Sequence, residues 1–211
     1  MNILLVVATE GEALFFGALV AEVAVTGIGA VNAALGTLQA ASGSRPDLII
    51  NVGIAGAFPQ GSLQIGDVVV SSQITYASMG AENSNGSFLD LRTLGFPLHG
   101  TFYNQLPVWS QAAQVAEMLN LPAGEMLTVD TATGTQTSLE RLQSCHPEAL
   151  TEGMEGAGVA MAGLRLDVPV LEVRGISNMV GPRDRESWKI PLALKNCREA
   201  LDRLLAVVQD F

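Results

Sequence analysis

NILLVVA, at residues 2–8, is a fully apolar run of strand length, and DLIINV, at residues 47–52, repeats it. The segment 30–41 between them has the composition of a helix. Strands that are apolar on both faces are typical of a parallel sheet covered by helices on both sides. The order strand, helix, strand therefore predicts an α/β fold with such a sheet.

Further strands and helices are expected along the rest of the chain. The patterns predict strands at 21–26, 66–75 and 169–176, a strand that runs into a polar loop at 124–133, and helices at 107–119, 138–142, 155–166 and 191–209. Residues 77–100 are rich in Gly, Asn and Ser without a clear period, so we expect an irregular surface excursion there. With 211 residues and no internal repeat, residues 1–211 are expected to form one domain.

The charge balance limits the partners of this chain. It carries 11 Lys+Arg against 21 Asp+Glu, a formal net charge of -10, so we expect no nucleic acid and no anionic membrane as partner. The apolar run 13–21 is too short to cross a bilayer. No positive region precedes the apolar residues 1–8, so they are expected to form a strand of a cytoplasmic protein, not a signal peptide.

Cysteines and histidines are few. Cys145 and Cys197 lie far apart without CxxC spacing, and His99 and His146 are the two histidines of the chain. The sequence therefore predicts no disulfide, no metal site and no cofactor.

Two carboxylates, Glu10 and Glu12, directly follow the first expected strand. Ligands of parallel sheets usually bind at this edge, where a general base would be useful. Equally, acidic residues at a helix start stabilise its positive end without any catalytic role. Position alone leaves both interpretations open.

Three glycine-rich segments follow. TGIG at 26–29 could bind phosphate, but it lacks the pattern of a phosphate loop, and a close-packed turn is favoured. NVGIAG at 51–56 ends a buried strand with small residues, which would let a flat ring approach the backbone. In GMEGAG at 153–158, Glu155 starts an Ala-rich helix; it either stabilises the helix end or grips two vicinal hydroxyls, as of a ribose.

The stretch LEVRGISNMVGPRDRESWKIP, residues 171–191, places an amide at the end of an apolar strand. Ser177, Asn178, Asp184 and Trp188 are expected in the polar loop that follows. An amide can hydrogen-bond a leaving group but cannot give it a proton.

Together, ATEGE (8–12), TGIG, NVGIAG, GMEGAG and VRGIS followed by Asn178 resemble, in order and spacing, the nucleoside phosphorylase and hydrolase family. They are most similar to its hydrolytic branch, the methylthioadenosine/adenosylhomocysteine nucleosidases. The closing pattern at 177–181 and 184–191 resembles the members that hydrolyse futalosine in menaquinone biosynthesis. The resemblance extends over essentially the whole chain.

This resemblance implies a three-layer α/β/α fold around a twisted, mostly parallel mixed sheet, and a homodimer or higher homo-oligomer that binds a small purine nucleoside. It implies that Glu12 positions the attacking water and that Met154 and Glu155 hold the ribose. The base and sugar pocket is then expected at Gly53, Ile54, Ala55, Gly56, Ala132 and Thr133. Phosphorylases of the family hold phosphate with arginines; none lies near TGIG, which favours water as the nucleophile.

Two residues depart from the adenine-specific nucleosidases, which have aspartate at Asn178 and serine at Ile54. An Asn amide donates to a 6-oxo group while its oxygen accepts from N7–H, so Asn178 is expected to select hypoxanthine over adenine. The change at Ile54 indicates only a more apolar wall near the sugar or the water.

The resulting hypothesis is an N-ribosyl hydrolase in which Glu12 activates water, Glu155 holds the ribose and Asn178 stabilises departing hypoxanthine. Asp184 is the candidate source of the N7 proton. Arg183, Trp188 and Lys189 are candidates for the carboxyphenyl end of futalosine, although basic loop residues usually face water. The alternatives are a methylthioadenosine/adenosylhomocysteine nucleosidase, another purine nucleosidase or phosphorylase, or a non-catalytic nucleoside-binding protein.

Overall fold

The computed structural model describes residues 1–17 and 22–211. Residues 18–21, which end the apolar run 13–21 and include the first residue of the strand expected at 21–26, lie outside the described part. The strands are β1 (Ile3–Val7), β2 (Glu22–Val25), β3 (Leu48–Ala57), β4 (Val68–Tyr76), β5 (Gly80–Glu82), β6 (Phe88–Asp90), β7 (Gln105–Leu106), β8 (Ala123–Thr128), β9 (Ala149–Gly153) and β10 (Val170–Met179). The helices are α1 (Glu10–Phe16), α2 (Ala30–Ser44), α3 (Leu91–Leu94), α4 (Ala112–Leu119), α5 (Gln136–Cys145), α6 (Gly156–Leu166) and α7 (Ile190–Val207), with 3-10 turns at Arg185–Ser187 and Val208–Asp210.

The central sheet is mixed, and part of it closes on itself. Its described strands run in the order β10-β4-β8-β9-β3-β1-β2, and β10 also pairs with β3. The five strands β3, β10, β4, β8 and β9 therefore form a ring, in which β10–β4 and β3–β9 are antiparallel. The expected mostly parallel mixed sheet is confirmed, since β1–β2, β1–β3, β3–β10, β4–β8 and β8–β9 are parallel.

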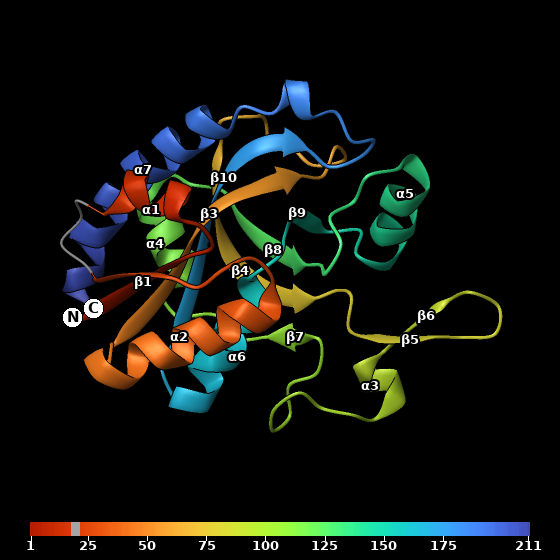
Figure 1. The fold of residues 1–211 in the computed structure, drawn as a ribbon, viewed down its shortest axis with the longest axis horizontal. Helices are drawn as coiled ribbons and strands as arrows, with labels where there is room; N and C mark the ends of the chain where they lie inside the picture. Colours follow the sequence, from red (N-terminus) through yellow and green to blue (C-terminus); the bar gives the residue numbers. More distant parts are fainter. Residues whose placement is uncertain (18–21) are drawn as a thin grey trace.

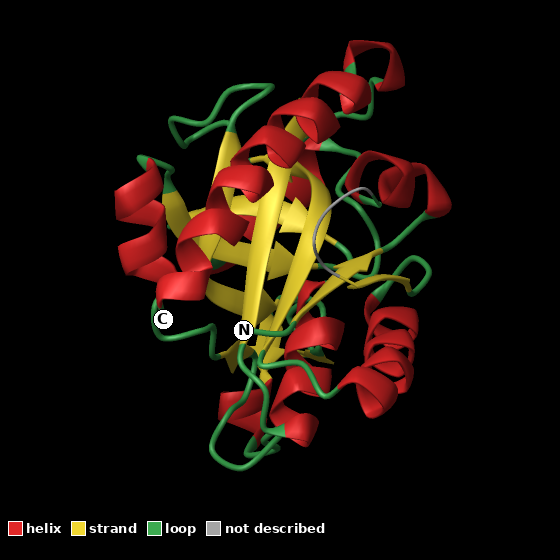
Figure 2. Cartoon of the chain, turned by 90° about the vertical axis from the view of Figure 1, so that its left-hand side faces the viewer, coloured by secondary structure: helices red, strands yellow, loops and turns green. Residues whose placement is uncertain are grey.

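Helices cover both sides of this sheet (Figures 1 and 2). β1 shows why: Ile3, Leu5 and Val7 pack into one core cluster with residues of α4 and α7, whereas Leu4 and Val6 pack into another with α2 and α6. A strand whose alternating side chains are buried on both faces needs a helical layer on each side. The sequence prediction of a doubly covered sheet is thus correct.

Two element predictions need correction, and one strand was not predicted. Residues 77–100 are not wholly irregular: β5 and β6 form a hairpin whose turn holds Asn85 and Gly86, with Gly86 at φ 82°, and α3 follows. β10 continues to Met179, so Ser177 and Asn178 belong to the strand and not to the loop after it. β9 was not predicted, because five residues beside a glycine-rich helix start give little signal of their own.

Within the described residues, no helix combines the length and apolar content needed to cross a membrane.

Candidate functional site

Glu12 is held at the start of α1 by a capping box. Its Oε2 accepts hydrogen bonds from the backbone N–H and the hydroxyl of Thr9, each at 3.0 Å, and Thr9 in turn caps the helix. Its other oxygen, Oε1, lies 3.4 Å from the backbone nitrogen of Ile54 on β3. Glu12 is buried, whereas Glu10 is exposed. The helix-end interpretation is therefore correct as far as it goes, but it leaves Glu12 Oε1 directed towards β3.

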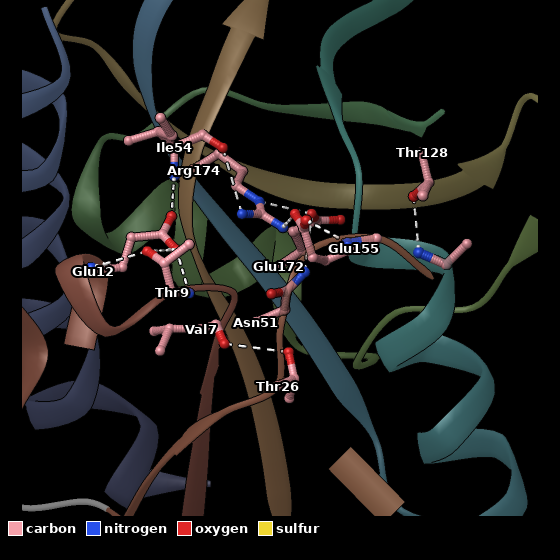
Figure 3. A network of polar contacts seen from close by, with 12 residues as sticks. Val7, Thr9, Glu12, Thr26, Asn51, Ile54, Thr128, Glu155, Glu172 and Arg174 are labelled. Atoms are coloured by element: carbon pink, nitrogen blue, oxygen red, sulfur yellow. Dashed lines mark hydrogen bonds and ion pairs between the residues drawn. The ribbon is translucent and has the colours of Figure 1, made fainter. Parts of the chain in front are cut away.

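Arg174 occupies the centre of the site, although sequence reasoning gave it no role (Figure 3). It is fully buried on β10, and its Nε donates to Glu172 Oε1 at 2.8 Å. Its terminal nitrogens lie 3.4 Å from Glu155 Oε2 and 3.4 Å from the carbonyl oxygen of Ile54. Burial alone would lower the pKa of Arg174, but the carboxylates of Glu172, Glu155 and Glu12 outweigh it and raise that pKa.

Gly53 is the point at which the two halves of this cluster meet. A Cβ on Gly53 would lie 2.6 Å from Arg174 Nη1 and 2.6 Å from Glu12 Oε1. The absence of a side chain on β3 therefore lets the guanidinium and the carboxylate approach each other across the strand.

Glu155 lies at the N-terminus of α6, yet its side chain does not cap that helix. Oε1 accepts from the backbone N–H of Gly29 at 3.1 Å, and Oε2 faces Arg174. Gly29 is the N-cap of α2 and has φ 92°, which favours glycine. The last N–H of TGIG thus binds a carboxylate of the same chain.

Glu172 supports Arg174 from within the core. Its Oε1 also accepts from the amide of Asn51 at 3.2 Å, and its backbone N–H donates to the hydroxyl of Ser71. Burial raises the pKa of Glu172, and Arg174 opposes the shift. The spacing of Glu172 and Arg174 places both on one face of β10, and this pair was the signal in the sequence that could have revealed the buried arginine.

Asn178 follows a bulge in β10. The register with β3 shifts between Ile176 and Asn178, which brings Asn178 opposite Gly56. Asn178 Nδ2 donates to the carbonyl of Met179 at 3.1 Å, and Oδ1 accepts from the hydroxyl of Ser177 at 2.8 Å. A backbone carbonyl can only accept, so this contact fixes which end of the amide carries the nitrogen.

The other residues expected around a base and sugar lie on β3, just before α6 and in the loop after β8. Gly53, Ala55 and Gly56 are buried on β3, and Ile54 and Met154 are half-buried. Ala132 and Thr133 lie in the loop after β8, which is attached to β9 because Thr133 donates from its backbone N–H, at 2.7 Å, and from its hydroxyl to Glu152. A surface cavity of about 280 Å³ lies against this loop and includes Ala132 and Thr133 in its lining, but not Glu12, Glu155 or Asn178.

The loop after β10 carries the remaining predicted residues, of which Arg183, Asp184 and Lys189 are exposed and Trp188 is half-buried. The Arg183 guanidinium lies over the Trp188 ring, 5.3 Å from its centre, and the Arg183 backbone N–H donates to Gly134 in the loop after β8. Asp184 caps the following 3-10 turn by accepting from the backbone N–H of Glu186 at 3.1 Å. Lys189 is exposed, and its backbone N–H donates to Ser177. Backbone hydrogen bonds thus join this loop to Ser177, which precedes Asn178, and to the loop that contains Thr133.

In chemical terms, the carboxylates of Glu12 and Glu155 converge on a buried cation, Arg174, and an oriented amide lies farther along β10. The arrangement can bind hydroxyl groups, place a water molecule and hydrogen-bond a heterocycle.

A sequence model of the phosphorylase superfamily matches residues 6–211 of this chain.

The chain belongs to the phosphorylase superfamily.

Members of the superfamily with curated names resemble this chain closely. A futalosine hydrolase of Streptomyces coelicolor is 40% identical over 88% of this chain and 78% of its own length. A 5'-methylthioadenosine/S-adenosylhomocysteine nucleosidase of Maridesulfovibrio salexigens is 30% identical over 73% of this chain and 66% of its own length. Among solved structures, the corresponding nucleosidase of S. pneumoniae with a transition-state inhibitor matches 99% of this chain and 100% of that one, with a TM-score of 0.82 at 22% identity. The last comparison shows the shared fold.

Proposed function

We propose that this member of the phosphorylase superfamily hydrolyses the N-ribosidic bond of futalosine, releasing hypoxanthine and dehypoxanthine futalosine in menaquinone biosynthesis. The oriented amide of Asn178 is the observation that carries the proposal. Each amide hydrogen makes one bond, so the second hydrogen of Nδ2 is available to the O6 of hypoxanthine, and Oδ1 has room to accept from N7–H. The similarity to futalosine hydrolases supports the same substrate.

Glu12 is the proposed base. As the C1'–N9 bond breaks, the ribose gains positive charge, and water adds its oxygen to C1' while one of its protons passes to Glu12. The carboxylate is already held by Thr9, so it need not reorganise to accept that proton. Arg174, which converges with Glu12 at Gly53, contacts Glu155 and the Ile54 carbonyl at 3.4 Å through its terminal nitrogens and is suited to orient the water.

Glu155 is proposed to bind the 2'- and 3'-hydroxyls and to stabilise the cationic sugar. Each of its oxygens makes one contact at 3.1 to 3.4 Å, and a carboxylate oxygen can accept more than one hydrogen bond. Half-buried Met154 precedes it and would pack against the ribose face.

The electrons of the broken bond remain on hypoxanthine, which must gain a proton at N7 to leave neutral. Asn178 has no proton to give away. We propose Asp184 or solvent as the donor. Asp184 is exposed, and its Oδ1 accepts the bond that caps the 3-10 turn, so the protonated form would carry its hydrogen on the other oxygen.

Water is proposed as the nucleophile in preference to phosphate. The TGIG turn that could have met an anion presents its final N–H to Glu155, a negative group. A phosphate placed there would face the carboxylate of Glu155, and like charges repel.

The carboxyphenyl end of futalosine is proposed to meet Arg183, Trp188 and Lys189. A guanidinium stacked on an indole presents both a charge for a carboxylate and a flat apolar face for a phenyl ring. All three belong to a loop joined to β10 at Ser177, directly beside Asn178.

A homodimer or higher homo-oligomer is part of the proposal. Ile28, Val31 and Leu35 are 58%, 70% and 62% exposed, and Val31 and Leu35 share one side of α2. This apolar stripe begins beside Gly29, which binds Glu155, so a second copy covering it would border the ribose site. Light scattering of the purified protein tests this: a monomer at all concentrations contradicts it, and Val31→Glu should shift a dimer towards monomer.

The decisive experiment incubates purified protein with futalosine, inosine and methylthioadenosine, without and with phosphate, and identifies the released base by chromatography. The proposal expects hypoxanthine from futalosine without phosphate. Adenine from methylthioadenosine as the main product, or strict dependence on phosphate, would contradict it.

A further inference from the structure

Glu172 is a buried carboxylate that the proposed mechanism does not use. It is 3% exposed, and its Oε1 accepts from Arg174 Nε at 2.8 Å and from the amide of Asn51 at 3.2 Å. Its Oε2 is buried without a hydrogen-bond partner among the described residues. Burying a carboxylate with one oxygen unpaired costs free energy, so stability does not explain why a carboxylate occupies this position.

Gly156 makes room for the unpaired oxygen. A Cβ on Gly156 would collide with Glu172 Oε2, and Gly156 is the first residue of α6. The carboxylate therefore lies against the N-terminal end of a helix, which carries partial positive charge. A proton on Oε2 would find no acceptor among the described residues. Burial raises the pKa of Glu172, but Arg174 opposes the rise, and the surroundings of both oxygens suit the ionised form.

The cluster around Arg174 holds more carboxylates than cations. Arg174 pairs with Glu172 at 2.8 Å and with Glu155 at 3.4 Å (Figure 3). Its Nη1 also converges with Glu12 Oε1 at Gly53. Among the described residues, no other cation forms an ion pair with these three carboxylates. One arginine cannot neutralise three carboxylates, so the cluster carries an excess of negative charge.

The proposed reaction needs that excess. As the C1'–N9 bond breaks, the sugar becomes cationic beside Glu12 and Glu155, the outer carboxylates. An arginine whose charge was not balanced would draw on the outer carboxylates and repel the cationic sugar. A third carboxylate bound to Nε balances the guanidinium from the side of the core.

Resting on the proposed function, we propose that Glu172 is a positioning residue that acts through Arg174: its charge balances the guanidinium, so that the outer carboxylates keep their negative charge for the cationic sugar. Arg174 can then orient the water without cancelling the field that stabilises the sugar. Its contact with Glu172 is the shorter one, and its contact with Glu155 is longer by comparison, which fits this division.

The test is calorimetric binding, at neutral pH, of two analogues that cannot be hydrolysed. One is 9-deazainosine, and the other is its iminoribitol counterpart, in which a protonated amine replaces the ring oxygen of the sugar. The ratio of their affinities measures how well the site stabilises a positive charge at the sugar ring. Wild type is compared with Glu172→Gln, whose amide keeps the shape of the side chain and can still accept from Arg174 Nε but carries no charge.

We expect wild type to bind the cationic analogue at least about 10-fold more tightly than 9-deazainosine. Glu172→Gln should reduce the affinity for the cationic analogue by roughly 10-fold and leave that for 9-deazainosine within about 2-fold. The kcat for futalosine should fall by a similar factor with KM unchanged. The melting temperature should be no lower than that of wild type, because Arg174 still has two carboxylates and the cost of burying the third is gone.

Glu125→Gln is the matched control. Glu125 is a half-buried carboxylate on β8 that accepts from the hydroxyl of Thr75 and lies 3.8 Å from His146 Nδ1. These partners lie outside the cluster of Arg174. Loss of the Glu125 charge should therefore change neither the two affinities nor kcat.

Equal weakening of both analogues by Glu172→Gln, or none, would overturn the proposal. A variant that does not fold, or that melts more than about 5 °C below wild type, would make Glu172 a structural residue and overturn it too. Release of hypoxanthine from futalosine by wild type separates the two proposals. If hypoxanthine is released and an overturning result is found, the role of Glu172 fails alone. If wild type releases no hypoxanthine from futalosine, the proposed function fails, and the role of Glu172 with it.

Discussion

Arg174 Nε lies 2.8 Å from Glu172 Oε1, while the terminal nitrogens of the same guanidinium lie 3.4 Å from Glu155 Oε2 and from the Ile54 carbonyl. The short contact holds the arginine back in the core. Its terminal N–H groups make the two longer contacts, with Glu155 and with the Ile54 carbonyl. A buried pair of this kind specifies a position more than it adds stability, and breaking it exposes the cost of burying each charge.

Replacing Arg174 by alanine should destabilise the protein strongly, because Glu172 and Glu155 would lose their cation inside the core. Loss of one partner of a buried pair typically costs about 3–5 kcal/mol. Urea titration of Arg174→Ala measures the free energy of unfolding. Lys195→Ala is the control, since Lys195 pairs with Glu199 on the exposed side of α7 and should cost less than about 1 kcal/mol. Equal losses in the two variants would contradict a central structural role for Arg174.

Glu12→Gln should reduce kcat by roughly 10²- to 10⁴-fold with little change in KM, because an amide cannot take the proton of water. Glutamine can also complete a capping box, so the melting temperature should stay close to that of wild type. Steady-state kinetics with futalosine measure the effect, and exposed Glu10→Gln is the control. Near-normal turnover by Glu12→Gln would remove Glu12 from the mechanism.

Because the carboxyl group of Glu152 is buried, we expect the free energy of unfolding to depend on pH through this group. Burial in the folded protein raises the pKa of the Glu152 carboxyl group. The folded state therefore binds the proton of this carboxyl group more tightly than the unfolded state does. The stability that the proton contributes is present below the ordinary pKa of about 4.5 and is lost as pH rises through the folded value. Glutamine does not titrate, so Glu152→Gln should not lose this stability. In ligand-free protein, its free energy of unfolding should therefore rise relative to that of wild type as pH rises above about 4.5. A stability difference that is constant between pH 4 and 8 would be evidence against it.

Arg183→Ala and Lys189→Ala should each raise KM for futalosine by roughly 2- to 10-fold, the scale expected for exposed charge pairs. KM for inosine, which has no carboxyphenyl group, should not change. This comparison separates loss of a contact from general damage to the loop of Asp184. Unchanged KM for futalosine in both variants would move the carboxyphenyl site elsewhere.

Much of the fold could be predicted because its first strands are apolar on both faces. Residues 2–8 and 47–52 form β1 and the beginning of β3 as expected. The ring of strands could not be predicted, because its closure depends on the pairing of β3 with β9 and with β10, far along the chain. The hairpin of β5 and β6 left a usable sign, the pair Asn85 and Gly86, which is typical of tight hairpin turns.

Residues of the candidate site could be predicted from the sequence only where they lie in a recognisable motif. Glu12, Glu155 and Asn178 lie in recognisable segments, but Arg174 and Glu172 are charged residues within an apolar strand, where isolated charges are usually excluded. Their spacing of two residues puts them on one face of β10 and makes them partners.

The central claim, hydrolysis of a 6-oxopurine riboside, is tested most directly by comparing kcat/KM of the wild-type protein for futalosine and for methylthioadenosine in phosphate-free buffer. An amide that hydrogen-bonds O6 and N7–H should favour the 6-oxo base by at least about 100-fold. Release of hypoxanthine from futalosine with that preference is the predicted result. An equal or greater kcat/KM for methylthioadenosine, with adenine as the released base, would contradict the account.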